Sequence, residues 1–99
     1  MTTITFERSG GAIGNELHLD LNLDSLIEYD SQRLEKMIDE ADFFNIPEDL
    51  AGSSSVDEFQ YTITVDDGIS YHTVHATDTT MPKSLLLLVK ELTLMRILH

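Results

Sequence analysis

The chain contains no cysteine, which excludes disulfide bonds, thiol nucleophiles and thiolate metal ligands. Basic residues are scarce: the chain has 6 lysines and arginines and 18 aspartates and glutamates, which gives a formal net charge of −12. Such a field repels phosphate backbones and anionic lipid surfaces, so we expect no nucleic-acid and no membrane partner. The longest apolar run, Leu85 to Val89, is far shorter than the roughly 20 residues of a transmembrane helix. The start of the chain shows no signal peptide, so we expect a soluble, cytoplasmic protein.

Known catalytic motifs are also missing. The sequence has no Ser-His-Asp arrangement, P-loop or dinucleotide fingerprint, and its glycines at 10, 11 and 14 join two expected strands rather than a strand and a helix. His72 and His75 are three apart on an expected strand, which sends them to opposite faces and prevents them from binding one metal. His18 and His72 could share the exposed sheet face, which leaves a metal site there open as an alternative. We predict no enzyme activity, no cofactor and no bound metal.

Alternation of apolar and polar residues predicts four β-strands, because successive side chains of a strand point to opposite faces. A fourth strand is expected over about 69–76, where β-branched and aromatic residues dominate but the inward face is ambiguous. Segment 9–15 should join the first two strands, and Asp67-Gly68 should form the turn between the last two. The inward positions of the first three strands are Ile4 and Phe6; Leu17, Leu19, Leu21 and Leu23; and Phe59, Tyr61, Ile63 and Val65.

Helical periodicity predicts two helices. The first should run from about Ser31 to Asp42, with Asp30 as its N-cap because a carboxylate there can accept a free amide of the first turn. The second should run from about Pro82 to Leu98, with the proline in its first turn. The expected core stripes are Leu34, Met37, Ile38 and Ala41 in the first helix, and Leu85, Leu88, Val89 and Leu92 in the second. Glu35, Asp39 and Asp42 should form an acidic flank on the first helix.

The resulting element order is ββαββα, which indicates an α+β fold. Each strand has one strongly apolar side, so we expect a four-stranded antiparallel sheet with two helices packed on one face. Residues 1–99 are enough for a single domain with one core and too few for two. Periodicity does not specify the strand order.

Four segments, in this order and at this spacing, resemble the emfourin family of small bacterial protein inhibitors of thermolysin-like metalloproteases. They are residues 8–14 (RSGGAIG), 43–47 (FFNIP), 57–61 (DEFQY) and 72–74 (HTV), and the resemblance extends from Ile4 to about Leu92. It implies that the chain blocks a thermolysin-like zinc protease by one-to-one occupation of the active-site cleft, with the zinc supplied by the protease. The alternative is a non-enzymatic, acidic regulatory or protein–protein interaction domain.

Two loops are candidates for protease contact. By the resemblance, the target favours bulky apolar residues after the scissile bond, and segment 9–15 offers Ile13 between glycines; folding of Ile13 back onto the core is the open alternative. The aromatics Phe43 and Phe44, with Pro47, are assigned to the core rather than to contact. The first loop contributes Gly10, Gly11, Ala12, Ile13 and Gly14, and the second contributes Ser54, Ser55 and Val56 as secondary candidates.

The last expected helix carries a second apolar stripe on nearly the opposite side from its core stripe. Its residues are Leu87, Leu94 and Leu98, with Lys83 and Lys90 along its edge. Exposed contiguous apolar surface on a small domain usually marks an interface, so a homodimer through this helix is expected. Two alternatives stay open: the end of the chain could fold back over this surface, or a different partner could dock there.

Overall fold

The computed structural model describes residues 2–10, 16–50 and 58–98. Two hairpin-like strand pairs alternate with helices, as the sequence predicts. The elements are β1 (Thr3–Gly10), β2 (Leu17–Asn22), the 3-10 turn η1 (Leu23–Ser25), α1 (Glu28–Glu40), η2 (Phe43–Asn45), β3 (Phe59–Asp66), β4 (Tyr71–Thr77) and α2 (Lys83–Leu98). The expected ββαββα order is therefore confirmed.

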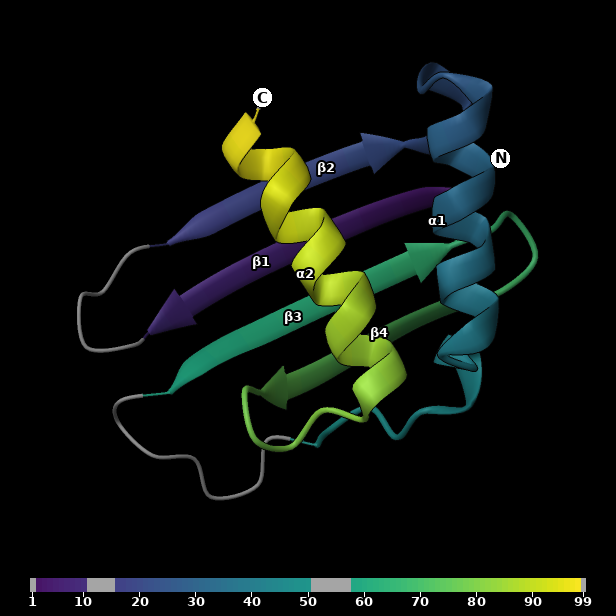
Figure 1. The fold of residues 1–99 in the computed structure, drawn as a ribbon. Helices are drawn as coiled ribbons and strands as arrows, with labels where there is room; N and C mark the ends of the chain where they lie inside the picture. Colours follow the sequence, from purple (N-terminus) through teal and green to yellow (C-terminus); the bar gives the residue numbers. More distant parts are fainter. Residues whose placement is uncertain (1, 11–15, 51–57, 99) are drawn as a thin grey trace.

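All four strands form one antiparallel sheet in the order β2-β1-β3-β4 (Figure 1). The two sequence hairpins meet through β1 and β3, which pair along their whole length from Thr3 opposite Asp66 to Gly10 opposite Phe59. This central pairing places the end of β1 and the beginning of β3 at the same end of the sheet.

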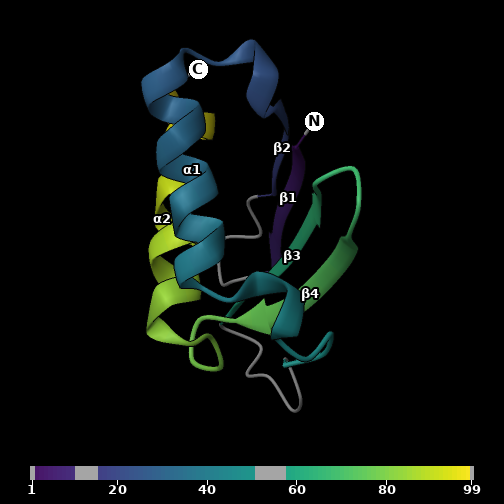
Figure 2. The same ribbon diagram turned by 90° about the vertical axis from the view of Figure 1, so that its right-hand side faces the viewer.

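Both helices cover the same face of the sheet (Figure 2). The core lies between the two layers, and the strand alternation read from the sequence is confirmed because Ile4, Phe6, Ile63 and Val65 are all buried. The inward face of β4, ambiguous in the sequence, is that of Val74 and Ala76. The predicted α2 stripe of Leu85, Leu88, Val89 and Leu92 is buried, as are Leu34, Ile38 and Ala41 of the first helical region.

The predicted start of α1 is wrong. The helix begins at Glu28, its N-cap position is Ile27 without a side-chain hydrogen bond, and Asp30 lies inside the first turn. The chain turns earlier than expected, because Leu23 leaves the strand and begins η1, where Asn22 accepts a hydrogen bond from the Asp24 amide. A carboxylate inside the first turn still stabilises the positive end of the helix dipole.

The boundaries of the last two elements also differ from the prediction. The Asp67 carboxylate accepts hydrogen bonds from the amides of Ile69 and Ser70, so residues 67–70 form the turn that Asp67-Gly68 predicted. Ile69, expected in the strand, is therefore 96% exposed in the turn, and β4 begins at Tyr71. Helix α2 begins at Lys83, and the carbonyl of Pro82 accepts the first helical bond from Leu86.

Segment 43–47, one of the four that resemble the family, has residues both in the core and on the surface. Phe43 is buried and Phe44 half-buried, which agrees with the prediction, but Pro47 is exposed, so its assignment to the core is wrong. The reason is that the chain leaves the core after Ile46 and runs along the edge of β4. There the Leu50 amide donates to the His75 carbonyl, and the His75 amide donates to the Glu48 carbonyl, each at 2.7 Å.

The alternative that His18 and His72 share the exposed sheet face is excluded. His72 lies on the helix-covered side, where its ring contacts Phe43 edge to face and its Nε2 is 2.6 Å from the Ile46 carbonyl oxygen. His18 and His75 lie on the open face, bonded to Glu7 and Thr62 respectively. The prediction that His72 and His75 point to opposite faces is confirmed.

Candidate functional site

The end of β1 and the beginning of β3, which adjoin the two segments expected to contact a protease, meet at one end of the sheet. Gly10, at the end of β1, is the register partner of Phe59, at the beginning of β3, and Arg8 is the register partner of Leu17, at the beginning of β2. Figure 1 shows these ends together at one side of the sheet. Of the predicted contact residues, Gly10 is described, whereas Gly11, Ala12, Ile13, Gly14, Ser54, Ser55 and Val56 lie outside the described residues.

Gly10 occupies a position that other residues would strain. Its φ of +82° lies in the left-handed region, which glycine adopts without steric penalty. A Cβ at Gly10 would also come within 3.3 Å of the Glu58 carbonyl oxygen. Glycine therefore allows the end of β1 to approach the residue that precedes β3.

Asp78 connects the beginning of β3 to the turn that precedes α2. Its carboxylate accepts a hydrogen bond from the Phe59 amide at 3.2 Å and another from the Tyr61 hydroxyl at 2.8 Å. The adjacent Thr79 hydroxyl donates to the Glu58 carboxylate. Burial, reinforced by the bond to Asp78, raises the pKa of Tyr61 to about 12.

Arg8 follows Ile4 and Phe6 along β1, and its side chain lies on the same inward face of the sheet. Its guanidinium carbon lies 4.2 Å from the centroid of the Phe59 ring, a cation–π arrangement. Its buried Nε has no hydrogen-bond acceptor within the described part of the chain. Phe59 in turn contacts Tyr61, which stacks on Phe6, so an aromatic row links Arg8 to the core.

Sequence reasoning missed Arg8 and Asp78 as site residues. A signal for Arg8 was present, because a charged residue at an inward strand position must find partners. Asp78 carried no comparable signal, since its partners Phe59 and Tyr61 are almost twenty residues away in the sequence.

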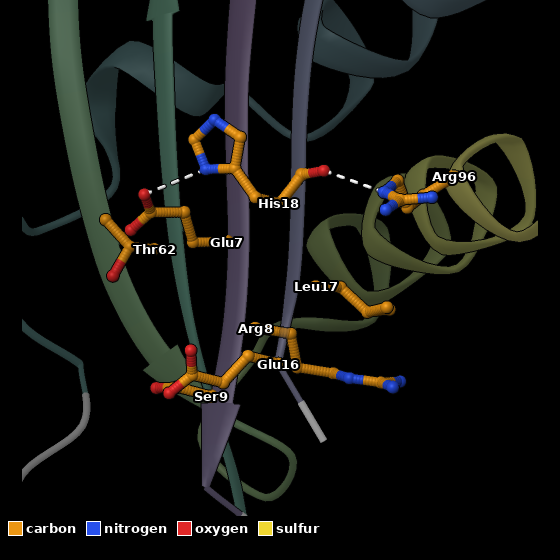
Figure 3. A pocket seen from close by; sticks show the side chains of 8 residues that line it. All are labelled: Glu7, Arg8, Ser9, Glu16, Leu17, His18, Thr62 and Arg96. Carbon is orange, nitrogen blue, oxygen red and sulfur yellow. Dashed lines mark hydrogen bonds and ion pairs between the residues drawn. The ribbon is translucent and has the colours of Figure 1, made fainter. Parts of the chain in front are cut away.

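Two clefts flank Arg8. The first, of about 490 Å³, lies around the end of β1 and the start of β2; Figure 3 shows Arg8 and Arg96 on the α2 side and Glu7 with the His18 ring on the other side. Within it, Arg96 Nε donates to the His18 carbonyl at 2.9 Å. The second cleft, of about 400 Å³, lies between α2 and the sheet; its lining is mostly apolar and comprises Arg8, Tyr61, Asp78, Leu86, Val89, Lys90, Thr93 and Leu94.

The open face of the sheet carries an exposed cluster around His18. The imidazole lies 2.9 Å from Asp20 and 3.0 Å from Glu7, and its hydrogen bonds to these two carboxylates raise the pKa of His18. The hydrogen bond between His18 and Asp20 also lowers the pKa of Asp20. Among the described residues, no group of three or more histidine, cysteine, aspartate or glutamate side chains could hold a metal ion. The cluster thus gives no support for a metal site involving His18.

The outer side of α2 is apolar, as expected. Leu87 and Leu94 are 51% and 53% exposed, and Ile97, which the sequence reading did not single out, is exposed beside them. Leu98 lies in the helix, but its side chain is outside the described part. In the portion of the chain that the structure describes, no helix is long and apolar enough to cross a membrane.

Comparisons with known proteins identify the family. The family model described as Emfourin matches residues 6–93, which is most of the chain. The match includes β2, α1, β3 and β4, most of β1 and α2, and all four segments that carry the resemblance. Neither the curated proteins nor the solved structures contained a match. The chain therefore belongs to the emfourin family of metalloprotease inhibitor domains, and this membership supports a role as a protease inhibitor rather than as an enzyme.

Proposed function

We propose that the chain inhibits a thermolysin-like zinc metalloprotease by binding it one to one and excluding peptide substrate from the active-site cleft. The observation that carries this proposal is the family match over residues 6–93. The protease would supply the zinc ion, so the inhibitor needs no metal site of its own.

The end of the sheet that carries Gly10 and Phe59 is the proposed contact region. A small inhibitor binds tightly when its contact segments are ordered before binding, because ordering opposes association. The left-handed Gly10, the Asp78 hydrogen bonds and the contact of Arg8 with Phe59 fix the strand ends that flank segments 11–15 and 51–57. We propose Ile13 as the apolar anchor, with Ser54 to Val56 as a secondary contact.

Assays of peptide hydrolysis test the inhibitor proposal. The pure protein, at micromolar concentration, should slow at least one member of a panel of thermolysin-like enzymes. A panel of serine proteases serves as the control and should be unaffected. Unimpaired hydrolysis by every metalloprotease in the panel would contradict the proposal.

A second candidate function is self-association or regulatory docking through α2. The specific observation is that Leu87 and Leu94 of α2 are each about half exposed; Leu94 also lines the apolar cleft. Together with Ile97, and with Leu98 as a further candidate, they form an apolar surface that a second copy could cover.

We expect a weak homodimer that tightens when salt is added, because each copy carries a net charge of −12 and salt screens the repulsion between copies. Leu94→Glu should abolish it by placing a charge in the interface. Sedimentation equilibrium measures both effects. A pure monomer at ~100 μM in moderate salt, well above a micromolar Kd, would rule the dimer out and leave the inhibitor proposal intact.

A further inference from the structure

We propose that the apolar cleft between α2 and the sheet is a second contact area for the target protease, and that it receives an apolar side chain lying next to an acidic one. This inference rests on the proposed inhibitory function and names a surface outside the two candidate loops. The cleft has a volume of about 400 Å³ and is lined by residues of β1, β3 and α2 and by Asp78.

The position of α2 creates this cleft. Figure 1 shows α2 crossing the sheet obliquely, with the end of β1 and the beginning of β3 extending past it on one side. Tyr61 and Arg8 come from the sheet, whereas Leu86 and Leu94 come from α2. Leu94 is about half exposed, so a bound apolar group would remove its surface from water.

The charge of the cleft contrasts with that of the whole chain. Arg8 and Lys90 line it against one acidic residue of the described lining, Asp78, so the lining is net basic in a chain of net charge −12. The acidic residue of the lining, Asp78, already accepts hydrogen bonds from Phe59 and Tyr61. The cleft therefore complements an acidic side chain.

The cleft adjoins the proposed contact end of the sheet, and this position favours the protease as its occupant. Arg8 lines the cleft, contacts Phe59 at the start of β3 and lies two residues before Gly10 at the end of β1. A protease bound at the Gly10 end of the sheet would therefore lie beside this cleft. Contacts at both places would raise affinity more than either does alone.

Two matched pairs of variants on α2 test the inference. Lys83 and Lys90 are both exposed, but of the two only Lys90 lines the cleft. Lys90→Glu should raise the inhibition constant at least about tenfold, whereas Lys83→Glu should change it less than about twofold, and the difference should shrink with added salt. Leu87 and Leu94 are equally exposed, and Leu94→Asp should weaken inhibition whereas Leu87→Asp should not.

The results separate this inference from the proposed function. Inhibition by the wild type, with selective weakening by Lys90→Glu and Leu94→Asp, would support both. A second outcome is that the wild type inhibits but the two variants of each pair have equal inhibition constants, with all variants folded by circular dichroism. This outcome would overturn the cleft contact and leave the inhibitor function standing. Failure of the wild type to inhibit would overturn both. Equal weakening by the two leucine variants, accompanied by loss of a dimer in sedimentation, would assign the surface to a second copy and overturn the inference.

Discussion

Replacing Phe43 with alanine should destabilise the domain by about 3–5 kcal/mol, as large-to-small changes of buried aromatics do. Phe43 is 1% exposed, and its ring contacts Phe44 and His72 edge to face. The loss is a large fraction of the roughly 5–15 kcal/mol that stabilises a small domain. Denaturant unfolding monitored by circular dichroism measures it.

Phe44→Ala is the matched control for this prediction. Phe44 is half-buried, so its truncation exposes less new cavity and should reduce the free energy of unfolding by a smaller amount. The folded fraction of each variant should inhibit the protease as the wild type does. A Phe43→Ala protein with unchanged stability but weakened inhibition would show that Phe43 is a contact residue rather than a core residue.

Ile13→Asp should weaken inhibition about thirtyfold, equivalent to ~2 kcal/mol, because an apolar anchor in a desolvated pocket carries a large share of binding energy. The prediction follows from the position of residue 13 in the segment between Gly10 and Glu16, at the proposed contact end of the sheet. Inhibition constants of the purified variant and wild type provide the measurement.

Val56→Asp is the control for Ile13→Asp. It introduces the same charge in the other candidate segment and should weaken inhibition less. Equal inhibition constants for the wild type and Ile13→Asp, with both proteins folded, would show that residue 13 is not the anchor. A larger effect of Val56→Asp would reverse the proposed ranking of the two segments.

The sequence predicted the sheet and its buried face well because alternation is a local signal. Ile63 and Val65 alternate with Thr62 and Thr64, and the buried face of β3 follows directly. The α2 stripe was equally clear, since its leucines recur at helical spacing. In both cases the pattern that reveals the buried face lies within one short stretch of sequence.

Features that depend on distant partners could not be predicted. The pairing of β1 with β3 brings Gly10 opposite Phe59, across almost fifty residues, and it places the end of β1 and the beginning of β3 at one end of the sheet. The start of α1 was misplaced because Asp30 fits an N-cap and a first helical turn equally well. The hydrogen bonds of Asp78 to β3 likewise follow from the tertiary structure alone.

Titration of a thermolysin-like protease with the pure protein tests the central claim most directly. With enzyme well above the inhibition constant, peptide hydrolysis should fall linearly and end at one inhibitor per enzyme, as one-to-one exclusion of substrate requires. A serine protease titrated in parallel should keep its full activity. Undiminished hydrolysis by the metalloprotease at several equivalents, across the enzymes of the panel, would contradict the account.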